Sequence, residues 1–185
     1  MDVRIIGIGN VLMGDDGVGP VVTRVLAAEY EFPPDVTVVD SANRGIDLMP
    51  YVADADVAIL IDTACGKHAP GVIERCSKAQ LFECARDDRL CPHNADVRRA
   101  LVDLERSGRG PRAVMLVAVV PQWIATGPNL SDTVRLAVPA VVEQIIEELT
   151  RLGIHARRRV DAREPETWWK RGATVTHAKD AAEQR

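Results

Sequence analysis

Aromatic residues are scarce in this sequence, at 4% of 185 residues, and its formal net charge is −4. Proteins that bind nucleic acid usually present a basic surface, often with aromatic side chains for base stacking, so we expect no nucleic-acid partner. No apolar run approaches the roughly 20 residues that cross a bilayer, so we expect no membrane association. The first residues also lack the long apolar stretch of a secretory signal.

The four cysteines include no C-x-x-C pair, which argues against a structural zinc site. Because the sequence shows neither a secretory signal nor a membrane-spanning run, we expect a cytoplasmic protein with reduced thiols. We also expect a monomer. Neither a Ser-His-Asp nor a Cys-His arrangement is legible in the sequence. Cys65 and Cys91 fall near the predicted site, but we interpret them as small buried residues rather than nucleophiles.

Apolar, β-branched runs alternate with segments of helical periodicity from the start of the chain to residue 152. This alternation predicts an α/β fold of three layers, a mostly parallel twisted sheet with helices on both faces. We expect strands over residues 3–8, 36–40, 57–61, 71–76 and 113–120, and helices over 18–26, 46–52, 94–104 and 132–152, with residues 78–89 ambiguous and Ser131 as the N-cap of the last helix.

The end of the sequence differs in character from the rest. Residues 1–152 are predicted to form one domain, and residues 153–185 a charged, flexible tail. Residues 151–185 contain nine basic and five acidic residues and no apolar periodicity. Trp168 and Trp169 stand out there as an apolar pair within a charged segment.

A glycine-rich loop joins the first strand to the first helix. It contains Gly9, Asn10, Asp15, Asp16 and Gly17. Gly-x-Gly after a strand, followed by an acid at the end of the next strand, imitates a dinucleotide-binding fingerprint. The imitation fails because Leu12 occupies the third glycine position. It fails again because two adjacent carboxylates would repel a pyrophosphate at the start of the helix.

A site for a divalent cation fits these residues better. In a parallel sheet, the loops after the strands meet at one edge, and four acids should come together there: Asp15, Asp16, Asp40 and Asp62. His93, which follows Pro92, could reach the same edge. Two aspartates and a histidine would leave coordination positions open for a substrate.

The same residues could instead have purely structural roles. Asp15 or Asp16 could serve only to stabilise the start of a helix. Asp62 could accept a hydrogen bond from Thr63 or Ala64 in a turn. His93 could be an exposed histidine with no role in chemistry.

The opening motif, Gly7-x-Gly9-Asn10-x-Leu12-x-x-Asp15-Asp16-Gly17-x-Gly19, resembles that of the hydrogenase maturation endopeptidases. The similarity continues through the strands that end at Asp40 and Asp62, through His93, and into the last helix, over residues 3–150. The resemblance implies an endopeptidase that removes the C-terminal extension of the nickel-iron hydrogenase large-subunit precursor after nickel insertion. It also implies that Asp16, Asp62 and His93 contact nickel supplied by that precursor. Family members often carry Glu where Asp16 stands.

Two mechanisms are compatible with this ligand set. Nickel could polarise the scissile carbonyl or activate water. Alternatively, nickel could only position the precursor, with Asp15 or Asp16 as the general base. A non-catalytic nickel-sensing chaperone or binding module with the same acidic edge is the competing class of protein.

Overall fold

The computed structural model describes residues 1–40, 48–64, 68–83, 92–165 and 167, and the side chains of residues 92–96 lie outside the described part. Its main sheet has five strands in the order β3-β1-β4-β6-β5. The strands are β1 (Val3–Gly7), β3 (Val36–Asp40), β4 (Val57–Thr63), β5 (Ile73–Ser77) and β6 (Ala113–Val119), and the helices are η1 (Gly14–Gly17), α1 (Val18–Glu29), α2 (Met49–Val52), α3 (Lys78–Glu83), α4 (Pro92–Arg106) and α5 (Asp132–Arg151).

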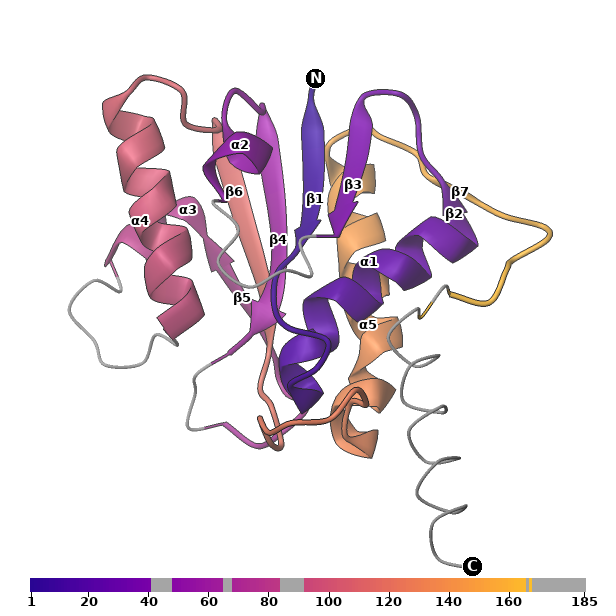
Figure 1. Cartoon of the computed structure of the whole chain (residues 1–185). Helices are drawn as coiled ribbons and strands as arrows, with labels where there is room; N and C mark the ends of the chain where they lie inside the picture. Colours follow the sequence, from indigo (N-terminus) through magenta and orange to yellow (C-terminus); the bar gives the residue numbers. More distant parts are fainter. Residues whose placement is uncertain (41–47, 65–67, 84–91, 166, 168–185) are drawn as a thin grey trace, which may run out of the picture.

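Helices cover both faces of this sheet (Figure 1). Helices α1 and α5 pack on one face, where Val22 and Ile145 join inward-facing strand residues such as Ile59 in one apolar cluster. Helices α2, α3 and α4 pack on the other face, around Leu60 and Leu101. Every residue of β4 is buried, as expected for a central strand covered on both sides. The predicted three-layer α/β architecture is confirmed.

The order of the strands determines where a ligand can bind. Strand β1 pairs in parallel with β3 on one side and β4 on the other, and β6 continues the parallel sheet beyond β4. The chain therefore moves first to one side of β1 and then to the other. Open α/β sheets bind ligands beyond the carboxyl ends of the strands at such a reversal. That point is the edge where β1 and β4 end.

Several elements begin or end away from their predicted limits. Strand β4 continues to Thr63, so Asp62 lies inside the strand rather than after it. The first helix is preceded by a 3-10 turn that contains both Asp15 and Asp16. The ambiguous segment after β5 begins as helix α3, and residues 84–91 lie outside the described part. The predicted N-cap is confirmed, because the Ser131 hydroxyl accepts a hydrogen bond from the amide of Val134 at 3.2 Å.

The first part of the predicted tail pairs with the domain. Strand β7 (Arg157–Arg158) is antiparallel to β2 (Tyr30–Glu31), which follows α1 directly. The amide of Arg159 donates a further bond to the carbonyl of Glu29 at 2.7 Å. Trp168 and Trp169 lie outside the described residues, so the division into domain and tail stays a prediction. No helix in the described part of the chain is long and apolar enough to cross a membrane.

Candidate active site

The glycine-rich loop is pressed against the ends of β1 and β4. Gly9 has φ +126°, and a Cβ there would lie 1.8 Å from the carbonyl oxygen of Asp16. A Cβ on Gly19 would lie 2.2 Å from the carbonyl oxygen of Ile8 and 2.6 Å from that of Ile61. Only a hydrogen atom fits at both positions. The two glycines therefore allow η1 and the start of α1 to pack directly against the edge where the strand order reverses.

Asp16 lies in η1 and is only 3% exposed. Its Oδ2 accepts a hydrogen bond from the amide of Asn10 at 2.9 Å. The side chain of Asn10 in turn accepts one from the amide of Leu12 at 3.0 Å. These two bonds fix the loop around the Asp16 carboxylate.

Asp62 is completely buried near the end of β4. Its Oδ1 accepts a hydrogen bond from the amide of Thr63 at 2.7 Å. This bond is one of the two predicted for a purely structural role of Asp62. The preceding residue, Ile61, is the register partner of Gly7 in β1, and its carbonyl accepts a bond from the amide of Ile8 at 2.8 Å. Because η1 contacts β4, the fold brings Asp16 and Asp62 to the same edge.

Asp40, the third strand-end acid, is the register partner of Gly7 on the other side of β1. Its Oδ2 accepts a hydrogen bond from Nε of Arg24 in α1 at 2.8 Å. This ion pair holds the Asp40 carboxylate against α1 at the rim of the edge.

His93 is the second residue of α4, and its side chain lies outside the described residues. The side chains that the structure does describe include no group of three His, Cys, Asp or Glu that could hold a metal ion. The set of Asp16, Asp62 and His93 as nickel ligands therefore stays a prediction. Oxygen and imidazole donors of this kind suit nickel as a divalent metal.

Asp15 has a different environment from Asp16, although the two are adjacent. It is fully buried, and its carboxylate accepts four hydrogen bonds. The donors are the amides of Gln122 and Trp123, at 2.8 and 3.1 Å, and the amide and hydroxyl of Ser131, at 2.6 and 2.9 Å. Asp15 thus fastens the loop after β6 to η1.

The contact between Gly14 and Trp123 was not predicted from the sequence. Gly14 has φ +62°, and a Cβ there would lie 2.4 Å from the Trp123 ring. The amide of Gly14 donates to the carbonyl of Gly127 at 2.8 Å, which joins the two loops again. Trp123, Ile124 and Leu12 remain 38%, 49% and 41% exposed, an apolar surface on these joined loops. The only available signal was a glycine directly before the acid pair.

The observed combination of fold and acidic edge can be compared with known proteins. The family model described as HycI, hydrogenase maturation protease, matches residues 20–148. The chain belongs to the hydrogenase maturation protease family. The predicted family resemblance is confirmed, and membership in a family of proteases makes the chain a hydrolase.

Individual hydrogenase maturation proteases are similar over most of their length. The hydrogenase 2 maturation protease of Escherichia coli is 26% identical over 84% of this chain and 95% of its own. The structure of the maturating endopeptidase HybD from E. coli superposes with a TM-score of 0.79 at 26% identity, covering 87% of this chain and 99% of that one. HybD from Thermococcus kodakarensis is 28% identical with a TM-score of 0.64, covering 80% and 99%.

Proposed function

We propose that this protein removes the C-terminal extension from the precursor of a nickel-iron hydrogenase large subunit after nickel has been inserted. The observation that carries the proposal is the burial of two carboxylates, Asp16 and Asp62, at one edge of the sheet. Carboxylate oxygens are ligands that suit a divalent cation. In this proposal the cation is the nickel of the precursor, so it belongs to the substrate.

Asp16 and Asp62, with His93 from the start of α4, would bind the nickel and thereby place the adjacent peptide at the ends of β1 and β4. Hydrolysis adds water across the scissile amide, and the amine of the extension leaves with a proton. Substrate-borne nickel can polarise the scissile carbonyl or lower the pKa of a bound water. If nickel only positions the peptide, Asp16 is better suited than Asp15 to act as the base, because four donors already engage the Asp15 carboxylate.

The direct test incubates the purified protein with nickel-loaded precursor and follows the mass of the precursor. We expect shortening with the unmodified protein, and none with His93→Ala, Asp62→Asn or Asp16→Asn. Asp16→Glu serves as the matched control: it keeps the charge and introduces the residue that family members often carry, so it should retain cleavage. Circular dichroism checks that each variant is folded.

A second arm of the experiment tests the role of the metal. Precursor without nickel should stay uncut, since the ligand set then has nothing to bind. Cleavage of nickel-free precursor at the full rate would refute nickel recognition. Binding of loaded precursor without any shortening would instead favour the non-catalytic nickel-sensing chaperone.

A further inference from the structure

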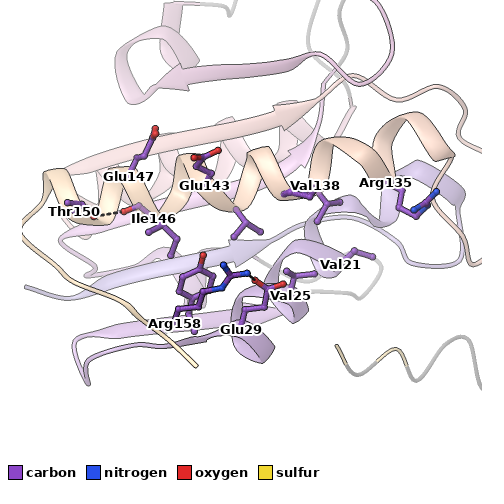
Figure 2. A pocket seen from close by; sticks show the side chains of 13 residues that line it. Val21, Val25, Glu29, Arg135, Val138, Glu143, Ile146, Glu147, Thr150 and Arg158 are labelled. Carbon is purple, nitrogen blue, oxygen red and sulfur yellow. Dashed lines mark hydrogen bonds and ion pairs between the residues drawn. The ribbon is translucent and has the colours of Figure 1, made fainter. Parts of the chain in front are cut away.

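An open groove of about 930 Å³ runs between α5 and α1, on the side of these helices that faces away from the sheet (Figure 2). Its floor is apolar: Val138, Val142 and Ile146 of α5 face Val21 and Val25 of α1. Residues spaced by four lie on one face of a helix, so each helix presents a continuous apolar stripe to the groove.

The rim of the groove is acidic along the outer edge of α5. Glu143 and Glu147 are exposed there and lie side by side in Figure 2. Within the described residues, neither forms an ion pair. The acid on the α1 side, Glu29, already pairs with Arg158 at 3.2 Å. An occupant with apolar side chains followed by positive charge would therefore complement the groove.

The chain itself passes close to this groove after β7. Arg158 is one of the lining residues. The amide of Arg163 donates to the carbonyl of Ala28, in the last turn of α1, at 3.5 Å. Trp168 follows five residues later, a span of at most about 18 Å when extended. Val25 is one helical turn from Ala28, roughly 5 Å along the axis, so the following segment can reach the floor.

We propose that residues 168–171 of this chain occupy the groove. This segment reads Trp168-Trp169-Lys170-Arg171, two indoles followed by two cations. The indole rings would cover the valine and isoleucine floor, the largest apolar burial that two side chains can provide. Lys170 and Arg171 would face the acidic rim. The segment would then bridge α1 and α5 and cover Val21, Val25 and Ile146, which are only partly buried, independently of the proposed proteolytic function.

Tryptophan fluorescence of the full-length chain can test this docking. Trp123→Phe leaves only the two tryptophans of the segment, because the sequence contains three in all. We expect emission at short wavelength and weak quenching by acrylamide, as for indoles in an apolar site. Glu143→Lys with Glu147→Lys should shift the emission to longer wavelength and increase quenching. Adding Lys170→Glu with Arg171→Glu to that variant should restore protection.

Two further variants separate the groove from the rest of α5. Ile146→Ser weakens the floor and should expose the indoles, with circular dichroism checking that the fold persists. Leu136→Lys changes an α5 residue that is 72% exposed and outside the groove, and should have no effect. Solvent-exposed emission before any groove substitution, or protection that ignores every groove substitution, overturns the proposal. Protected emission that requires a dimer, by light scattering, also overturns it and assigns the groove to a second copy.

Discussion

The carboxylate of Asp15 accepts two hydrogen bonds from Ser131, one from its amide at 2.6 Å and one from its hydroxyl at 2.9 Å. The same hydroxyl accepts a bond from the amide of Val134 and so caps α5. One buried acid in η1 therefore holds the start of a helix more than a hundred residues away in sequence. Because Asp15 and Asp16 are adjacent in η1, the anchoring of Asp15 also holds Asp16 at the edge of the sheet. Asp15 can have this role without touching the substrate.

Replacing Asp15 by Asn should destabilise the protein by about 2–4 kcal/mol. The side-chain amide cannot accept all four buried hydrogen bonds, and its NH2 group would face N–H or O–H donors instead of acceptors. The midpoint of urea unfolding measures this change. Asp132→Asn is the matched control: Asp132 pairs with Arg135 at the same helix start, but its side chain is 88% exposed. Such a surface pair contributes about 0–1 kcal/mol. Equal costs for the two variants would contradict the anchoring role of Asp15.

Gly14→Ala should cost more than Gly108→Ala, although both glycines have similar positive φ values of +62° and +70°. The shared cost of that backbone conformation is about 1 kcal/mol. A Cβ on Gly108 meets nothing within 4 Å, whereas one on Gly14 meets the Trp123 ring. Urea unfolding should show the excess cost, and a Trp123→Ala background should remove most of it. An excess that persists in that background would rule out the ring as its cause.

Gly19→Ala tests the close approach of α1 to the sheet. Alanine in a helix is normally more stable than glycine by about 1 kcal/mol. Here the new methyl group would meet the carbonyl oxygens of Ile8 and Ile61, which belong to the backbone and cannot rotate away. We expect a loss of about 3 kcal/mol or more, since overpacking that moves backbone exceeds ordinary core substitutions. Ala27→Gly, at an exposed position of α1, should cost only about 1 kcal/mol. A stable Gly19→Ala variant would show that the helix can move away from the edge.

The sequence predicted the fold well where one apolar pattern dominated. The continuous apolar runs of β4 and β6 and the periodic valines of α5 each have one good solution, to be buried in a layered sheet. A mostly parallel sheet then followed from the alternation of elements, and the edge carrying Asp16 and Asp62 followed from its parallel strands. These acids could be placed near each other without any knowledge of side-chain contacts.

Contacts between distant loops were beyond this reasoning. The pairing of Asp15 with Ser131 and the packing of Trp123 on Gly14 depend on how two irregular loops meet, and loop residues carry no periodic signal. The pairing of β2 with β7 was missed for a similar reason. Each strand has only two residues, too few for an alternating pattern to appear.

Glu148 should make the stability of α5 depend on pH. It is 8% exposed and accepts hydrogen bonds from Arg151, at 2.9 and 2.5 Å, and from Arg75 of β5, at 3.3 Å. The hydrogen bonds from Arg151 lower the pKa of Glu148, against the opposing effect of its burial, and the positive charges of Arg151 and Arg75 lower it further. A lowered pKa in the folded state means that ionised Glu148 stabilises the fold above the usual glutamate pKa of about 4.3.

This stabilisation is lost as the pH falls through the lowered pKa, because Glu148 is then protonated in both the folded and the unfolded state. At about pH 7, Glu148→Gln should lower the free energy of unfolding by about 1 kcal/mol, a modest value because the Arg151 side chain is 68% exposed. The difference between the two proteins should shrink below about pH 4. Urea unfolding across this range measures it, with Glu83→Gln, at an exposed end of α3, as the control that should show no such trend. A difference that stays constant from neutral to acidic pH would mean that charge on Glu148 does not stabilise α5.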